Sequence, residues 1–187
     1  MKNDFNLCPM CGSKAIKNKL NKKWYCPDCD FDLYCNVAAA VGVVIIDKEN
    51  KILLETRAKE PRKGYLAFPG GFIDADERAE DAVIRECKEE IGVAISEVQF
   101  ICTFPNTYEY RNIEYKTCDM FFLAKLPDDF KNIEDFISTL KAQESEVLGF
   151  SSWKIETKED VDKIPLAFES ARKTLYTVLE KGNRSKR

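Results

Sequence analysis

Residues 70–93 have the sequence GGFIDADERAEDAVIRECKEEIGV, which opens on two glycines and ends in a strongly charged run. The pattern predicts a helix over about residues 77–91. At 100° per residue, Ala79, Ala82 and Val83 lie on one face of that helix, which we expect to pack against the protein interior. The inward face is therefore apolar in its first half.

Carboxylates occupy the second half of the same face. Glu86 and Glu90 continue the apolar stripe, and Glu89 lies at its margin. Inward-facing acids are unfavourable unless a cation neutralises them, and two acids four residues apart repel each other. Arg85 could orient one carboxylate, and the carbonyl of Gly70 could be a further ligand. The stripe indicates a divalent-ion site, and the alternative is the solvated acidic end of an ordinary helix.

A basic loop at residues 57–67 precedes the glycines. Its side chains Arg57, Arg62 and Lys63 could face the phosphates of a ligand. Hard oxygen ligands together with cationic side chains are typical of a site for Mg²⁺ and a phosphate chain. We therefore expect a phosphorylated substrate.

The same stretch resembles the Nudix box. Gly71, five residues, Glu77, seven residues and then RECKEEIGV at 85–93 match every specified polar and glycine position. Only Cys87 departs, since the family usually has an aliphatic residue there, and a buried thiol is a mild substitute. The resemblance runs over about residues 37–179. It implies an α/β fold, a Nudix α/β/α sandwich with a mixed sheet.

The resemblance also implies the chemistry. Nudix hydrolases cleave a pyrophosphate bond in a nucleoside diphosphate linked to another group, using Mg²⁺ or Mn²⁺. By position, the metal ligands would be Gly70, Glu86, Glu89 and Glu90. Glu89 could instead be the base, and Arg85 would orient a glutamate. Many members also use an acid beyond the box as base or ligand, for which Glu144 and Glu146 are both candidates.

Residues 104–110 bear on the substrate. Their sequence FPNTYEY replaces the Ser-Gln-Pro-Trp type motif of NADH pyrophosphatases and looks more similar to ADP-ribose pyrophosphatase-like Nudix proteins. Tyr108 and Tyr110 could stack on a base, or they could be ordinary strand aromatics. We expect hydrolysis of ADP-ribose or a similar nucleotide sugar. The alternatives are an NADH or RNA-cap pyrophosphatase and, in another class, a non-catalytic Nudix module that binds nucleotide or nucleic acid.

Cysteines mark a second region near the start of the chain. Four of the eight form two CxxC pairs, Cys8–Cys11 and Cys26–Cys29, and the chain has no histidine. Two such pairs predict a closed four-thiolate site for a structural Zn²⁺. Two disulfides or a thioredoxin-type redox pair are the alternatives. A zinc ribbon before a Nudix domain resembles the architecture of bacterial NADH pyrophosphatases.

These patterns divide the chain into a zinc ribbon at 1–36, a Nudix hydrolase domain at 37–182 and a basic tail at 183–187. Residues 1–36 are too few for a hydrophobic core, so metal would supply the folding energy. Within the domain we expect strands at 37–46, 51–55, 97–104, 114–125 and 147–153. Further helices are expected at 130–141 and 166–181, the last one stopping at Gly182.

Composition limits the partners and the compartment. The net charge of −3 argues against nucleic acid as a partner. Lysines beside aromatic residues at 14–25 could still contact a nucleic-acid strand, and the alternative for that segment is a solvated hairpin. No apolar run is long enough to span a membrane. The chain starts without a signal-peptide pattern, and the other four cysteines are expected to be buried, so we expect a cytoplasmic protein. A homodimer is expected only by analogy with relatives.

Overall fold

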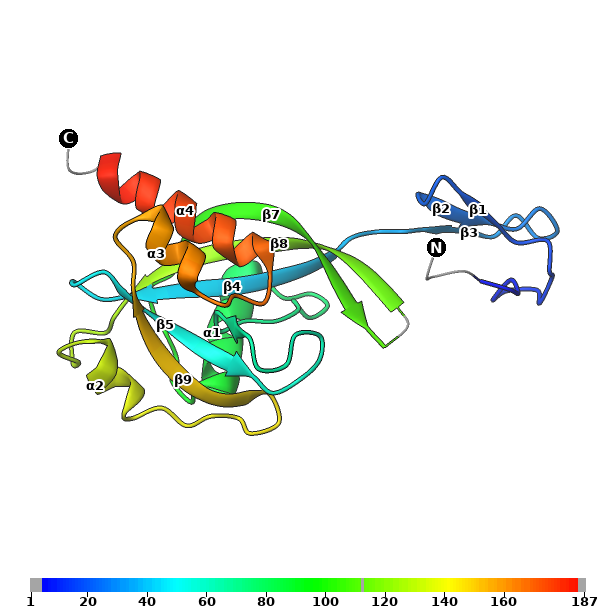
Figure 1. Cartoon of the computed structure of the whole chain (residues 1–187). Helices are drawn as coiled ribbons and strands as arrows, with labels where there is room; N and C mark the ends of the chain where they lie inside the picture. Colours follow the sequence, from blue (N-terminus) through cyan, green and yellow to red (C-terminus); the bar gives the residue numbers. More distant parts are fainter. Residues whose placement is uncertain (1–4, 112, 185–187) are drawn as a thin grey trace. The chain divides into compact units, whose positions relative to one another are not determined.

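The structure is a computed structural model, and it describes residues 5–111 and 113–184 (Figure 1). The chain forms two compact units. One comprises Met1–Ala38 and Thr107–Lys116, and the other comprises Ala39–Asn106 and Thr117–Arg187. The boundaries expected at residues 36 and 182 stay predictions. Of the predicted basic tail, residues 185–187 lie outside the described part, as do residues 1–4 of the predicted ribbon.

The first unit contains a small antiparallel sheet in the order β1-β2-β3. Its strands are β1 (Lys17–Lys19), β2 (Lys23–Tyr25) and β3 (Asp32–Tyr34). Trp24 is buried and packs edge-to-face on Phe5, with 5.0 Å between ring centroids. Few other large side chains are available for burial in three such short strands, so apolar packing contributes little stability here.

The larger sheet has the order β6-β5-β4-β8-β7, with β9 paired to β5. Its strands are β4 (Ala38–Ile46), β5 (Lys51–Arg57), β6 (Leu66–Ala67), β7 (Gln99–Tyr110), β8 (Ile113–Lys125) and β9 (Val147–Lys154). β5 runs antiparallel to β4, β6 and β9. The ends of β4 and β8 meet, because the Leu126 N–H donates to the Ile46 carbonyl at 3.0 Å, so these two strands run parallel. The predicted mixed sheet is confirmed.

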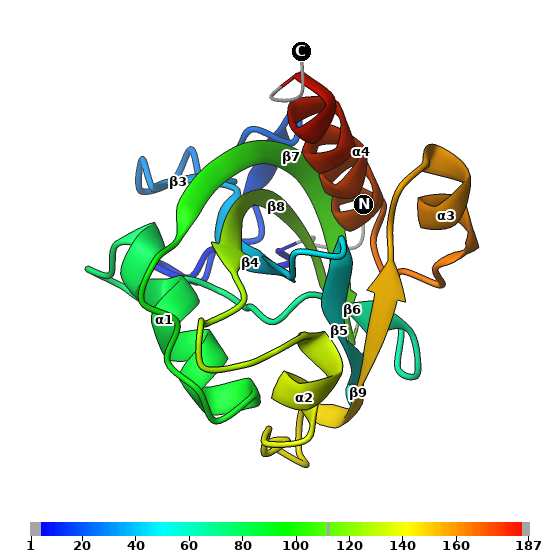
Figure 2. The ribbon, with the colours of Figure 1, turned by 90° about the vertical axis from the view of Figure 1, so that its left-hand side faces the viewer.

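Helices cover both faces of this sheet. They are α1 (Ala79–Glu90), α2 (Ile133–Ile137), α3 (Lys158–Lys163) and α4 (Glu169–Arg184). Figure 2 shows α1 and α4 on opposite sides of the strands. Two separate apolar clusters match this arrangement: Leu53 packs with Val83 and Cys87 of α1, whereas Ile52 and Leu54 pack with Ala171 and Leu175 of α4. The predicted α/β/α sandwich is therefore confirmed.

None of the helices in the described residues is both long and apolar enough to cross a membrane.

Several elements differ from the sequence prediction. The helix expected at 130–141 shrinks to α2, which starts at its cap Asn132 and ends before Ser138. The last helix does not stop at Gly182 but continues to Arg184, because a glycine in a final turn is tolerated. β7 extends six residues past its expected end at 104, through Pro105, which is possible because β7 is an edge strand.

The expectation that the four remaining cysteines are buried was only partly correct. Cys87 is fully buried on α1, as expected. Cys102 and Cys118 are half-buried, and Cys35 is exposed. Cys35 follows β3 directly, in a unit whose short strands bury few side chains, so a small apolar group there stays at the surface.

Candidate active site and thiolate cluster

The glycine loop before α1 lies along β4. The Val41 N–H donates to the Gly71 carbonyl at 2.8 Å, and the Val43 N–H donates to the Pro69 carbonyl at 3.0 Å. Gly70, between these two contacts, has a φ of +147°, and a Cβ there would stand 2.2 Å from the Val41 carbonyl oxygen. Only glycine allows the loop to approach β4 this closely.

α1 carries its carboxylates against this loop. The helix buries Ala82, Val83, Glu86 and Glu90 of the predicted stripe together with Cys87, whereas Ala79 is half-buried and Glu89 is exposed. Glu90 is 4% exposed and its Oε2 accepts from the Gly70 N–H at 2.7 Å. Glu86 is 9% exposed, and its carboxylate lies so close to Gly71 that a Cβ there would be 2.6 Å from Oε1. The two glycines thus position two different carboxylates.

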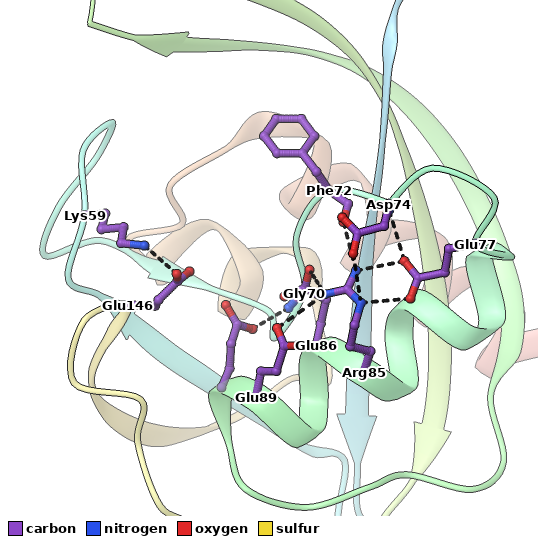
Figure 3. A network of polar contacts seen from close by, with 10 residues as sticks. Lys59, Gly70, Phe72, Asp74, Glu77, Arg85, Glu86, Glu89 and Glu146 are labelled. Carbon is purple, nitrogen blue, oxygen red and sulfur yellow. Dashed lines mark hydrogen bonds and ion pairs between the residues drawn. The ribbon is translucent and has the colours of Figure 1, made fainter.

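Arg85 connects Glu86 and Glu89 to Glu77, which precedes α1 (Figure 3). Its Nε and Nη2 donate to the two carboxylate oxygens of Glu77, each at 2.8 Å. Its Nη1 donates to Glu86 at 2.8 Å and to Glu89 at 3.3 Å, and Nη2 also donates to the Phe72 carbonyl at 3.1 Å. The guanidinium is therefore fully used in orienting protein groups. The role of Arg85 in orienting a metal-binding glutamate stays a prediction.

The carboxylates around Arg85 and Gly70 have pKa values shifted in opposite directions. The bidentate contact with Arg85 lowers the pKa of Glu77 to about 2. Burial raises the pKa of Glu90 to about 8, which the Gly70 N–H opposes and the charge of Glu86 reinforces. Burial also raises the pKa of Glu86, against the influence of Arg85. The inner carboxylates resist ionisation and would gain from a nearby cation.

The structure separates the two candidate acids beyond the Nudix box. Backbone hydrogen bonds hold Glu146: its N–H donates to the Gln143 carbonyl at 2.8 Å, and its carbonyl accepts from Ala58 at 2.7 Å. Its side chain pairs with Lys59 and, as a nearby charge, raises the pKa of Glu90. Glu144 is exposed, and the main charges that shift the pKa values of Glu86 and Glu90 include Glu146 instead.

The sequence interpretation missed Glu55. This residue of β5 is 3% exposed, and its buried Oε2 has no hydrogen-bond partner within the part of the chain that the structure describes. Burial raises its pKa well above the usual range, and the charge of Glu90 adds to that effect. A signal was available, since an acid inside the apolar run KILLETR is unusual for a central strand.

The predicted substrate-binding residues are more scattered. Arg57 donates through Nε to the Pro61 carbonyl at 3.1 Å and lies over the Phe168 ring, so it holds the basic loop. Arg62 lies over the Tyr65 ring, and Lys63 is exposed. Tyr108 and Tyr110 belong to Thr107–Lys116, which groups with the other compact unit. Roles for these five in binding substrate, Arg57, Arg62, Lys63, Tyr108 and Tyr110, stay predictions.

The four predicted thiols come together. The Sγ atoms of Cys8, Cys11, Cys26 and Cys29 all lie within 4.8 Å of one another. Two of the separations, Cys8–Cys29 and Cys11–Cys26, are 3.7 Å, far longer than the ~2.05 Å of a disulfide. A tetrahedron with ~2.3 Å zinc–sulfur bonds has edges of about 3.8 Å. Among the described residues, no other set of three metal-binding side chains is gathered so tightly.

The pKa values of Cys8 and Cys29 in this thiol cluster are shifted in opposite directions. At Cys8, burial opposes ionisation, but the backbone N–H groups of Cys11 and Met10 favour it, and the pKa falls to about 7. At Cys29 the Phe31 N–H favours the thiolate, yet neighbouring thiols and burial raise the pKa to about 12. Four adjacent thiolates therefore require a cation, and the geometry could hold one.

The chain is similar to known proteins of one family. It matches the family described as NUDIX domain over residues 37–176. The ADP-ribose pyrophosphatase of Methanocaldococcus jannaschii is 47% identical over 81 residues, which are 43% of this chain and 44% of that protein. The NAD-capped RNA hydrolase NudC of Pseudomonas putida strain W619 is 28% identical over 100 residues, which are 52% of this chain and 35% of that protein. The chain thus spans less than half the length of these curated relatives.

Solved structures share the fold. A NUDIX hydrolase from Nitrosomonas europaea aligns with a TM-score of 0.62 and 23% identity, covering 95% of this chain and 92% of that one. The NUDIX domain of Shewanella oneidensis NrtR, solved in complex with ADP ribose, aligns with a TM-score of 0.57 and 22% identity, covering 87% of this chain and 94% of that one. At these identities the likeness establishes the architecture alone.

Proposed function

The chain belongs to the NUDIX family, and from this premise we propose that it hydrolyses a pyrophosphate bond in a nucleoside diphosphate linked to another group, ADP-ribose or a similar nucleotide sugar first. The observation that carries the proposal is the pair of buried carboxylates on α1. Glu86 and Glu90 are held by Arg85 and by the Gly70 N–H, as a preformed cation site requires. The relative that is an ADP-ribose pyrophosphatase supports this choice of substrate.

The residues present fit a divalent metal ion. Glu86 and Glu90 are buried carboxylates whose pKa values are raised by burial, and Arg85 is already shared among several acids. Glu86, Glu89, Glu90 and the Gly70 carbonyl would hold Mg²⁺ or Mn²⁺, since all four supply the hard oxygen ligands these ions prefer. A bound ion would supply positive charge to the pyrophosphate oxygens and favour deprotonation of water.

A carboxylate of the protein would accept the proton of the attacking water. We assign Glu146 rather than Glu144 as the base, because its backbone is fixed from two sides and its charge acts on Glu86 and Glu90. The Glu146 carboxylate would take a proton from the attacking water, whose oxygen forms a bond to one phosphorus. The bridging oxygen leaves with the other phosphate, so ADP-ribose and water give AMP and ribose 5-phosphate. Lys59 would keep Glu146 in place.

NADH and NAD-capped RNA form a second candidate class of substrate. The chain is also similar to NAD-capped RNA hydrolases, which supports an NADH or RNA-cap pyrophosphatase as the alternative. A non-catalytic nucleotide-binding module is the alternative of another class. The buried pair Glu86 and Glu90 favours an enzyme, because buried acids with raised pKa values cluster at catalytic sites.

A hydrolysis panel tests the proposal. ADP-ribose, NADH, NAD-capped RNA, nucleoside triphosphates, diadenosine polyphosphates and sugar nucleotides would each be incubated with Mg²⁺ and with Mn²⁺, and the products separated by chromatography. We expect ADP-ribose or another nucleotide sugar to react fastest and to stop reacting when the metal is chelated. Faster reaction of NADH or capped RNA would favour the alternative, and nucleotide binding without turnover would support the non-catalytic module.

For the thiol cluster we propose a structural Zn²⁺ held by all four sulfurs. The support is the 3.7 Å spacing of the Sγ pairs and the absence of a free side for a further ligand in a four-thiolate tetrahedron. Elemental analysis of the purified chain should find about one zinc per chain.

A further inference from the structure

Glu55 is a buried acid that the functions described so far do not use. Its side chain is 3% exposed, between the flanking strands β6 and β9, where Ala67 and Phe150 are its register partners. Its Oε2 is the buried side-chain polar atom that, within the described residues, has no hydrogen-bond partner. Leaving such an atom unpaired is unfavourable, and more so for a charged group. A bound ligand that contacts this oxygen would therefore stabilise it.

Strand geometry turns Glu55 toward α1. Successive side chains of a strand point to opposite faces of the sheet. Leu53 belongs to the apolar cluster on the α1 face, whereas Ile52 and Leu54 belong to the cluster on the α4 face. Glu55, two residues after Leu53, thus shares the face on which α1 presents Glu90.

The charges that shift the pKa of Glu55 agree with this placement. The groups that act on its pKa are Glu90, Arg57, Glu146 and Glu86, in falling order, and only Arg57 is a cation. That guanidinium is already engaged with the Pro61 carbonyl and the Phe168 ring. Cys87 of α1 also has its pKa raised by burial and by Glu90, Glu55 and Glu86. Glu86 is already paired with Arg85 and Glu146 with Lys59, so among these acids Glu55 is the one with an unpaired buried oxygen.

We propose that Glu55 binds the divalent cation of this site from the sheet side, together with Glu90 on the helix side. This inference rests on the metal dependence in the proposed function, but not on any particular substrate. Two carboxylates from facing elements would hold an ion between the sheet and α1, so that the Oε2 of Glu55 gains its missing partner. Carboxylate oxygens are the ligands that Mg²⁺ and Mn²⁺ prefer.

Direct Mn²⁺ binding without substrate tests the proposal. Free Mn²⁺ would be titrated by electron paramagnetic resonance against the wild-type chain, Glu55→Gln and Glu55→Leu. The matched control is Glu49→Gln, an exposed acid in the turn before β5 that changes the net charge by the same amount. We expect both Glu55 variants to weaken binding by about tenfold or more, as loss of a metal-site group does, and the control to bind as the wild type does.

Stability of the metal-free protein gives the second measurement. Replacing a buried, unpaired acid by leucine should leave the melting temperature unchanged or raise it. Unfolded Glu55 variants would overturn the proposal, because Glu55 would then have a structural role. Wild-type Mn²⁺ affinity in both variants would also overturn it, and would indicate a proton shared between Glu55 and Glu90. A wild-type chain that binds no Mn²⁺ would overturn it as well.

Hydrolysis is measured separately, so the two proposals can fail independently. Weakened Mn²⁺ binding by the Glu55 variants, with no turnover by the wild type, would support the metal ligand and refute the proposed function. Turnover by the wild type, with unchanged Mn²⁺ binding by the variants, would support the proposed function and refute Glu55 as a metal ligand.

Discussion

Replacing Gly71 by alanine should disable the active site and leave the fold nearly intact. The new Cβ would stand 2.6 Å from Oε1 of Glu86, and ordinary contacts begin near 3.4 Å, so the carboxylate must withdraw by about 0.8 Å. Metal–oxygen distances tolerate only about 0.2 Å. Since a misplacement near 1 Å can reduce a rate about 100-fold, we expect a loss of that order in hydrolysis of ADP-ribose.

The folded state should tolerate this change. Gly71 does not have a positive φ, and its new methyl group meets the far end of a flexible side chain. We expect a loss of about 1 kcal/mol or less in the free energy of unfolding, measured by urea titration with circular dichroism. Wild-type activity of Gly71→Ala would refute the reasoning, since it would mean that Glu86 does not work from the position seen here.

The neighbouring Gly70 is the matched contrast. An alanine there combines a φ of +147° with a Cβ 2.2 Å from the backbone oxygen of Val41 and 2.8 Å from the Cα of Gly42. Backbone atoms of a central strand cannot withdraw as a side chain can, so we expect a loss of about 3 kcal/mol or more in unfolding free energy. Equal stability of the two variants would contradict the described packing of the loop on β4.

Three further predictions concern the rest of the molecule. Because Arg85 lowers the pKa of Glu77 to about 2, the pair stabilises the fold above the ordinary glutamate pKa of about 4.3 and stops doing so as the pH falls through 2. Glu77→Gln should thus be less stable than the wild type at pH 7, with a difference in urea midpoint that disappears near pH 2; a constant difference would contradict this. Cys26→Ser should lower the zinc content below about one per chain and speed amide exchange at residues 17–34, whereas unchanged zinc would exclude the four-thiolate site. Leu175→Ala should cost about 3 kcal/mol of unfolding free energy, because this side chain is fully buried between α4 and the sheet, and a loss below about 1 kcal/mol would contradict that packing.

The helix that carries the site could be predicted from local pattern. The expected helix at 77–91 is observed as Ala79–Glu90, and Glu86 and Glu90 are buried as the 100° spacing requires. The pattern sufficed because the stripe spans three turns of one helix, so its period appears in consecutive residues. α3 could also have been predicted, since Thr157 and Asp160 form a capping box.

Features that depend on distant segments could not be predicted in this way. Glu55 faces α1 only because β5 pairs between β4 and β9, which no local pattern in β5 specifies. α2 ends early because the chain after Ser138 turns to α1, where Lys141 and Gln143 donate to the carbonyls of Ile91 and Glu90. The same turn places Glu146 rather than Glu144 beside the site, which explains why the sequence left both acids open.

Metal-dependent hydrolysis of ADP-ribose by the wild type and Glu90→Gln is the most direct test of the account. Glu80→Gln, which removes a partly exposed acid from the first turn of the same helix, is the control for the loss of one charge. We expect the wild type and the control to release AMP with Mg²⁺ at similar rates, and Glu90→Gln to be slower by about 100-fold or more while staying folded. Near wild-type release of AMP by Glu90→Gln would contradict the claim that the buried carboxylates of α1 form the catalytic centre.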